Sequence, residues 1–214
     1  TINPDLNYYG SIEVSVEVSD GNLSDSTSFI LTVISVNDAP VVVNPIDDLE
    51  VLEDSVPVSI DISNVFDDPE NGSDLTLFVT EDIDALSASI EGTTLILTFS
   101  ENAHGSGEVT VSASDVTSRL TASTSFNVTV ESVNDAPVLS HPGGQTIDED
   151  GSLTIDLLAS DVDGDELIFS ASADNNATID VVGSSLTVTP ASNYYGSISV
   201  GVAVYDGYLS DSTG

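Results

Sequence analysis

The chain has 214 residues, of which 37 are acidic and only one, Arg119, is basic, so its formal net charge is −36. This balance excludes binding to nucleic acid, because the phosphates would have to be neutralised by lysine and arginine side chains. The complete lack of cysteine excludes disulfides, thiolate catalysis and zinc sites of the cysteine type.

Hydrophobic residues nevertheless make up 40% of the sequence, which is typical of a folded domain rather than of a disordered acidic tail. No apolar run approaches the roughly 20 residues that a membrane-spanning helix needs, so membrane insertion is not predicted. The excess of acid has two interpretations: a solvated surface suited to salty water, or carboxylates that hold divalent cations. Composition alone favours the first.

The sequence repeats itself. The residues NYYGSIEVSVEVSDGNLSDSTS at 7–28 return as NYYGSISVGVAVYDGYLSDSTG at 193–214, and a weaker copy begins at Asn102. The residues SVNDAPV also occur twice, at 35–41 and 132–138. The repeats predict three pieces: the C-terminal part of a truncated repeat, a complete repeat, and a repeat lacking its last strand, at residues 1–39, 40–136 and 137–214.

Alternation of apolar and polar residues predicts strands throughout the chain. In the first piece, SIEVSVEV places an apolar residue at every second position from Ile12 to Val18, which is the period of a half-buried strand. In the last piece, Ile198 to Val204 repeat the pattern. The complete repeat is expected to hold seven strands, near residues 47–52, 56–62, 75–80, 86–90, 94–99, 107–114 and 121–133. Seven short strands separated by turn signals predict an all-β protein, with tandem seven-stranded Greek-key β-sandwich repeats of the cadherin/Ig-like type in a linear array.

The acidic residues gather at the turns of this predicted fold. If strands A to G alternate in direction, the linker that enters a repeat lies at the same end as its B–C and F–G turns, and the linker that leaves lies beside the A–B and E–F turns. Around the second linker this brings together eight residues with oxygen-bearing side chains: Glu53, Asp54, Glu101, Asn134, Asp135, Asp161, Asp163 and Asp206. Ca²⁺ binds about six to eight oxygens in flexible geometry, whereas Mg²⁺ demands a stricter octahedron and keeps its waters, so the prediction is a calcium site.

The first linker repeats the arrangement with fewer acids, because the repeat before it is truncated. Its candidate ligands are Asn37, Asp38, Asp68, Glu70 and Asp115. We expect a weaker or incomplete calcium site there. Pro40 and Pro137 stiffen the two linkers, since proline fixes φ and cannot extend a helix.

Other motifs give weaker evidence of function. The residues DVDGD at 161–165 resemble half of an EF-hand loop, but the twelfth residue from Asp161 is Ser172, not glutamate. The two histidines, His104 and His141, have no second histidine or cysteine near them in sequence, so a catalytic or transition-metal role is not expected. The Tyr-Tyr pairs at 8–9 and 194–195 could stack on a sugar, although packing at a sandwich corner is the favoured interpretation.

These motifs resemble the cadherin-like tandem repeats, of the tandem-95 type, found in large bacterial surface and secreted adhesins. The family's early acid matches Glu53 and Glu149, its Asp-x-Asp turn matches Asp161–Asp163, and its Asn-Asp linker matches residues 36–40 and 133–137. The resemblance implies calcium-stiffened extracellular modules that act as spacers in a long adhesin. Ser35 and Ser132 stand where the family has an acid, and Ala39 and Ala136 where it has a second asparagine, which implies fewer calcium ions per junction.

Three functions remain open at this stage. The first is a calcium-rigidified structural spacer of an extracellular or cell-surface adhesin, whose partners are the neighbouring repeats. The second is a recognition module that binds a cell-surface glycan or another copy of the chain, including strand exchange between copies. The third, an enzyme, is not expected, because the paired carboxylates recur in each repeat and no nucleophile–base pair is evident.

Overall fold

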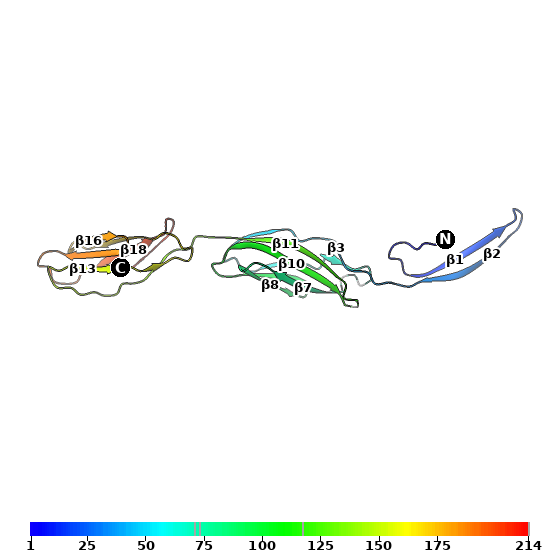
Figure 1. Ribbon diagram of the computed structural model, residues 1–214, viewed down its shortest axis with the longest axis horizontal. Helices are drawn as coiled ribbons and strands as arrows, with labels where there is room; N and C mark the ends of the chain where they lie inside the picture. The colour runs from blue at the N-terminus through cyan, green and yellow to red at the C-terminus, as the bar shows by residue number, and fades with distance from the viewer. Residues whose placement is uncertain (71, 73, 117, 214) are drawn as a thin grey trace. The chain divides into compact units, whose positions relative to one another are not determined.

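The computed structural model describes residues 1–70, 72, 74–116 and 118–213, and these residues form strands and turns without any helix (Figure 1). None of them therefore belongs to a helix that is long and apolar enough to cross a membrane. The chain divides into two compact units, Thr1–Ser132 and Val133–Gly214. The predicted all-β fold is confirmed.

The first unit begins with an antiparallel hairpin of β1 (Gly10–Ser19) and β2 (Ser24–Val33), in register from Gly10 opposite Val33 to Ser19 opposite Ser24. Asp20 closes the turn by accepting the N–H groups of Asn22 and Leu23 through its Oδ1 at 2.9 and 2.8 Å. These two hydrogen bonds, that from Leu23 first, hold the pKa of Asp20 below its ordinary value. Aspartate is typical of such turns for this reason.

The complete repeat in the first unit is a sandwich of two main sheets, the architecture that the sequence predicted. Its strands are β3 (Val41–Val42), β4 (Leu49–Leu52), β5 (Val58–Asp61), β6 (Phe66–Asp67), β7 (Leu75–Glu81), β8 (Leu86–Glu91), β9 (Thr94–Phe99), β10 (Gly105–Asp115) and β11 (Thr121–Glu131). One sheet has the order β4-β11-β10-β7, and the other has the order β5-β9-β8. The two-residue strands β3 and β6 pair with each other and were not predicted, because two residues are too few to show a period.

The first strand of this repeat is split between two sheets. β3 pairs antiparallel with β6, whereas β4 runs parallel to β11 with Leu49 opposite Val128. Asn44-Pro45 lies between the two halves, and a proline cannot donate to a strand ladder, so the chain leaves one sheet there and joins the other.

The core of the complete repeat follows from the alternation in its strands. From Val109 to Asp115 in β10 and from Phe126 to Val130 in β11, every second side chain is buried while its neighbours are partly or fully exposed. The apolar residues of these and the facing strands that are at most 2% exposed are Leu95, Leu97, Val109, Val111, Ala113, Phe126, Val128 and Val130.

The second unit repeats this plan. Its strands are β12 (Val138–Leu139), β13 (Leu153–Asp156), β14 (Ala159–Ser160), β15 (Ile168–Ala173), β16 (Ala177–Val182), β17 (Ser185–Pro190), β18 (Val200–Tyr205) and β19 (Ser210–Thr213). They form sheets of order β13-β17-β16 and β15-β18-β19 and the small pair β12-β14. β19 pairs antiparallel with β18, from Val202 opposite Thr213 to Tyr205 opposite Ser210.

Tyr194, the first tyrosine of the second pair, takes the packing role that the sequence favoured for both pairs. Tyr194 donates its hydroxyl to the backbone oxygen of Ser197 at 3.0 Å, closing a corner just before β18. Gly196 stands beneath the ring at φ +140, and a Cβ there would lie 3.0 Å from the Tyr194 hydroxyl. The second tyrosine of the pair, Tyr195, is exposed.

Candidate metal centre

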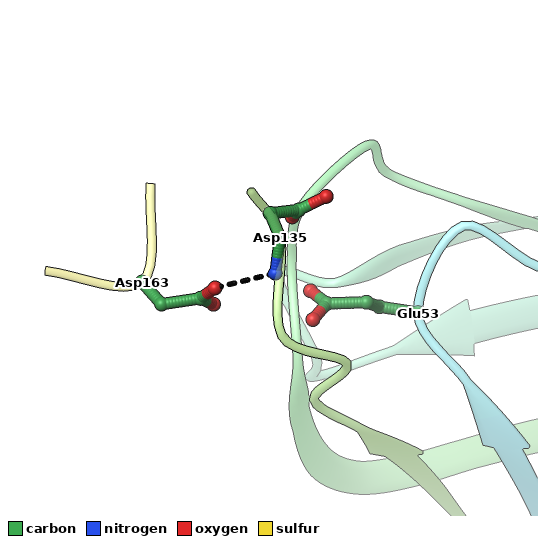
Figure 2. A group of neighbouring side chains, drawn as sticks. All are labelled: Glu53, Asp135 and Asp163. Carbon is green, nitrogen blue, oxygen red and sulfur yellow. Dashed lines mark hydrogen bonds between the residues drawn. The ribbon is translucent and has the colours of Figure 1, made fainter. Parts of the chain in front are cut away.

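In the second unit, the linker that enters the repeat is fastened to the B–C and F–G turns. Asn134 donates its Nδ2 to Asp206 Oδ2 and to its neighbour's carbonyl, the backbone oxygen of Asp135, both at 2.9 Å. The backbone N–H of Asp135 donates to Asp163 Oδ2 at 2.8 Å, and Figure 2 shows the Asp163 carboxylate directed at that nitrogen. We call this set, Asn134, Asp135, Asp163 and Asp206, the second linker latch.

The B–C turn of this unit is an acidic loop. Asp161 Oδ1 accepts the N–H groups of Asp163 and Gly164 at 3.0 Å and that of Asp165 at 3.3 Å, and Gly164 supplies the positive φ of 79° that the turn requires. The carboxylates of Asp161, Asp163 and Asp165 each offer an oxygen, and these oxygens lie within 4.8 Å of one another. Like charges this close repel unless a cation joins them.

Asp206 is the buried acid of this latch, 6% exposed. Its Oδ1 accepts the N–H groups of Tyr208 and Leu209, both at 2.6 Å, while Oδ2 accepts from Asn134. Burial raises the pKa of Asp206, but the hydrogen bonds from Asn134, Tyr208 and Leu209 together outweigh burial and hold the pKa below its ordinary value. The carboxylate is therefore charged at neutral pH.

The first unit has an equivalent arrangement at its own entering linker, which we call the first linker latch. The backbone N–H of Asp38 donates to Glu70 Oε2 at 2.9 Å, as that of Asp135 does to Asp163. Asn37, however, does not contact Asp115, the acid of the F–G turn, directly. Its Nδ2 donates to Ser118 Oγ at 2.9 Å, and Ser118 Oγ in turn donates to Asp115 Oδ2 at 2.7 Å. Asp68, which completes this set, accepts the N–H of Glu70 at 3.0 Å. The sequence contained no signal for Ser118, because its position is not repeated in the second unit.

At the other end of the complete repeat, Glu53 lies in the turn that follows β4. It is 4% exposed, and its N–H donates to the backbone oxygen of Glu131, the last residue of β11, at 2.8 Å. His104 Nδ1 lies 3.6 Å from Glu53 Oε2, an ion pair whenever the imidazole is protonated. Glu53, also drawn in Figure 2, is thus held against the strand that leads out of the repeat.

Asp54 and Glu101, also predicted as ligands, take other places in the same region. Asp54 adopts a left-handed conformation at φ 59, and its Oδ1 accepts the N–H of Asn102 at 2.9 Å. The second unit repeats this contact between Asp150 and Asn193, also at 2.9 Å. Asp54 therefore fastens the A–B turn to the E–F turn, and Glu101 is an exposed residue of that E–F turn.

Four carboxylates, those of Glu53, Asp68, Asp115 and Asp206, are buried to between 1% and 6% exposure. Burying a charged carboxylate is costly unless hydrogen bonds and an opposite charge compensate. The whole sequence offers one basic side chain against 37 acids. The donor set at these turns consists mainly of carboxylates and amides, the hard oxygen ligands that Ca²⁺ prefers.

The fold and this geometry define the class: the chain consists of cadherin/Ig-like β-sandwich repeats. The family model described as the bacterial Ig domain matches residues 134–214, which are almost the whole of the second unit. No curated protein matches the chain.

Several solved structures are similar at low identity. An endo-fucoidan hydrolase from glycoside hydrolase family 107 is 21% identical over 96% of this chain, with a TM-score of 0.37, and the chain spans about a third of its length, 33%. Mouse protocadherin-24 EC1-3 is 13% identical over 98% of this chain and 79% of its own, with a TM-score of 0.47. Drosophila N-cadherin EC1-4 is 16% identical over 97% of this chain and 58% of its own, with a TM-score of 0.40.

Proposed function

We propose that the chain is a set of calcium-rigidified spacer repeats from a large extracellular, adhesin-type protein, and that it is not an enzyme. The observation that carries the proposal is the cluster of carboxylates beside the second linker, where oxygens of Asp161, Asp163 and Asp165 lie within 4.8 Å of one another. A divalent cation would offset the repulsion between these like charges.

The stronger site belongs to the second linker. Asn134, Asp135, Asp161, Asp163 and Asp206 come from the second unit, where hydrogen bonds already hold most of them together. Glu53 is the ligand we assign from the first unit, with Asp54 and Glu101 in the surrounding shell. The assignment follows from the short span of chain between the two residues. The backbone N–H of Glu53 donates to the backbone oxygen of Glu131, and Asp135 is only four residues after Glu131, at most about 14 Å of extended chain.

The weaker site belongs to the first linker. Asn37, Asp38, Asp68, Glu70 and Asp115 are its ligands, with a hydroxyl where the second latch has a direct bond between asparagine and aspartate. This site has fewer carboxylates, and one of them is joined to the linker only through a hydroxyl. Its affinity for Ca²⁺ should therefore be lower, because affinity follows the number of charged ligands and the rigidity of the site.

Calcium would stiffen the linkers because a shared ion removes the freedom of two or three residues that otherwise act as a hinge. Pro40 and Pro137 are both buried and already restrict the backbone beside each latch. Sites of modest affinity, with dissociation constants of about 10⁻⁴ to 10⁻³ M, are filled outside cells, where extracellular calcium modules work. We therefore propose that the protein is extracellular and that its repeats act as spacers.

The test is thermal unfolding of the chain in CaCl₂, in MgCl₂ and in EDTA. A ligand at 100 times its dissociation constant adds about 2.7 kcal/mol to the free energy of unfolding. For a unit of this size that corresponds to a rise in Tm of roughly 10–20 °C. Calcium is expected to produce this rise and magnesium a much smaller one. Equal Tm values in calcium and in EDTA would reject the proposal.

Stiffening is measured separately, by the distance between labels on the two units. Calcium is expected to narrow the distribution of that distance, and EDTA to broaden it again. The Asp180→Asn variant is the matched control, because Asp180 is an exposed residue of β16 outside both latches and its removal should leave the calcium response unchanged.

A further inference from the structure

Two nearly identical segments of the chain differ on a single surface. Residues 193–213 repeat residues 7–27, and the two copies differ at only five positions. The second copy has Ser199, Gly201, Ala203, Tyr205 and Tyr208 where the first copy has Glu13, Ser15, Glu17, Ser19 and Asn22. The differences remove two carboxylates from the second copy and give it two additional tyrosines.

Four of the five differences lie on the outward face of one sheet. Val202 and Val204 of β18 are buried in the core of the second unit, at 4% and 0% exposure. The positions that alternate with them, from Ser199 to Tyr205, therefore lie on the outward side of the strand. The valines themselves are the same in both copies. The change is thus confined to the surface, since the fifth difference, Tyr208, is in the turn that follows β18.

The two additional tyrosines form an exposed patch with an isoleucine. In the sheet, Tyr205 lies between Ile168 of β15 and Ser210 of β19, which are its directly opposed partners. Ile168, Tyr205 and Tyr208 are 59%, 43% and 79% exposed. We call these three residues the outer tyrosine patch. The row that corresponds to Ile168, Tyr205 and Ser210 in the complete repeat has no aromatic residue and consists of Thr76, Ser114 and Thr121.

The patch is bordered by small side chains with hydroxyl groups. In the next row of the sheet, Ala203 lies between Ser170 and Ser212, which are both exposed. Glu17 occupies the place of Ala203 in the first copy, so the second unit has no long charged side chain two positions before Tyr205. Both rows are paired on the two sides of β18, so this surface consists of residues inside the sheet and not of an open strand edge.

Hydrogen bonds hold the patch in place. The hydroxyl of Tyr205 donates to the backbone oxygen of Gly207, which fixes the ring against the F–G turn. Asp206 Oδ1 accepts the N–H groups of Tyr208 and Leu209, both at 2.6 Å, so the backbone that carries Tyr208 is also fixed. A ligand that binds here therefore loses little free energy to the ordering of the protein backbone.

The chemistry of this surface suits an uncharged ligand. Neither the patch nor its bordering serines carry a charge, and the formal net charge of −36 on the whole chain repels polyanions. Sugar rings combine apolar C–H faces, which pack on aromatic rings, with hydroxyl groups, which form hydrogen bonds with serine. A neutral glycan offers both features without a charge.

The patch is too small for a stable protein partner. Specific protein–protein interfaces bury about 800 Å² on each side, around a central group of apolar side chains. Three exposed side chains supply only a part of that area. A sugar ring, in contrast, needs no more than one aromatic ring on which to stack.

We propose that the outward face of β15, β18 and β19 binds a neutral glycan. Sugar rings stack on Tyr205 and Tyr208, and the hydroxyls of Ser170, Ser210 and Ser212 form hydrogen bonds with sugar hydroxyls. This recognition site goes beyond the spacer function and needs no metal ion in contact with the sugar. The second unit then acts as a binding repeat within an array of spacers.

The test is calorimetric titration of the 214-residue chain in CaCl₂ with neutral hexasaccharides of β-linked glucose, mannose and galactose. At least one of them is expected to bind with a dissociation constant below about 1 mM. A hexamer of galacturonic acid, which has the same length but is charged, is expected not to bind. The proposal is overturned if none of the three neutral sugars binds at concentrations up to about 10 mM, or if the charged hexamer binds as tightly as they do.

The first copy of the segment supplies the matched variants. Tyr205→Ser combined with Tyr208→Asn restores the residues of the first copy and is expected to weaken binding by roughly tenfold or more, because each aromatic contact contributes a factor of about two to ten. Ala203→Glu keeps both tyrosines but places a long charged side chain beside them, and it should also weaken binding. Tyr195→Ala removes a tyrosine that is 87% exposed and lies outside the patch, so binding should not change.

Thermal unfolding of the same variants separates this proposal from the spacer function. All of them should keep the calcium-dependent rise in Tm, because none of them removes a residue of either latch. Glycan binding that persists in the double variant, or that Tyr195→Ala weakens as much, overturns the glycan site and leaves the spacer function untouched. Sedimentation equilibrium tests the other occupant: self-association that the double variant abolishes would assign the patch to a second copy of the chain and would also overturn the proposal.

Discussion

The two linker latches make the same backbone contact with different side chains around it. In both, the N–H of the linker aspartate donates to a B–C acid: Asp38 to Glu70, and Asp135 to Asp163. The asparagine before it bonds Asp206 directly in the second latch but reaches Asp115 through Ser118 in the first. The backbone contact therefore sets the position of the linker, whereas the side chains set how much negative charge gathers there.

The largest expected difference between the latches is in calcium affinity. Asp163→Asn keeps an acceptor for the Asp135 N–H but removes a charge from the acidic loop of Asp161, Asp163 and Asp165. We expect it to abolish most of the calcium-dependent rise in Tm of the second unit, roughly 10 °C or more. Glu70→Gln, the same change in the first latch, should remove a smaller part of the total response. Calorimetric titration and thermal unfolding of both variants measure this, and equal losses would show that the latches do not differ.

The corner glycines Gly105 and Gly196 differ between the two repeats in a way that does not depend on metal. Gly196 and Gly105 both have positive φ, 140 and 145, but an added Cβ meets the Tyr194 hydroxyl at 3.0 Å only in the second unit and nothing within 4 Å in the first. Each alanine substitution costs about 1–3 kcal/mol for the backbone conformation. Gly196→Ala should cost more than Gly105→Ala, because the tyrosine must also move. Denaturant unfolding in EDTA tests this ordering.

The hydroxyl of Ser118 is a feature of the first latch alone. Ser118→Ala removes both the acceptor for Asn37 and the donor to Asp115, which should lower the free energy of unfolding of the first unit by about 1 kcal/mol. Ser118→Thr keeps the hydroxyl and serves as the control. If the alanine and threonine variants unfold alike, the relay through Ser118 contributes nothing.

The smallest expected effect concerns pH. Asp174, outside both latches, accepts the N–H groups of Asn176 at 2.9 Å and Ser199 at 3.2 Å, and these bonds, that from Asn176 first, hold its pKa below the ordinary value. A lowered pKa stabilises the fold above the pKa of the unfolded chain, and this stability is lost as the pH falls through the folded-state pKa. Asp174→Asn should therefore destabilise the second unit at pH 7 and make little difference near pH 2. A destabilisation of equal size at both pH values would refute this account of Asp174.

Much of the fold was predictable because its signals are local. The strands at 75–80, 86–90 and 94–99 were expected from period-two alternation, and the structure places β7, β8 and β9 within one residue of those limits. The candidate site was harder to predict from the sequence. The sequence indicated acids at the right turns, but it did not distinguish Asp163, in the latch, from Asp54, which fastens one turn to another. That difference depends on backbone conformation: Asp54 is left-handed at φ 59, which no residue pattern revealed.

By itself, the sequence determined the all-β class, the repeat and the gathering of acids around the linkers, because alternation and antiparallel connectivity constrain neighbouring segments. The tertiary structure alone decided the contacts between distant residues: Asp54 with Asn102 across 48 positions, and Asn37 with Ser118 across 81. It also decided that the first strand of the complete repeat splits between β6 and β11. These features arise from how whole sheets fit together, and packing over such sequence distances leaves no periodic trace in the order of the residues.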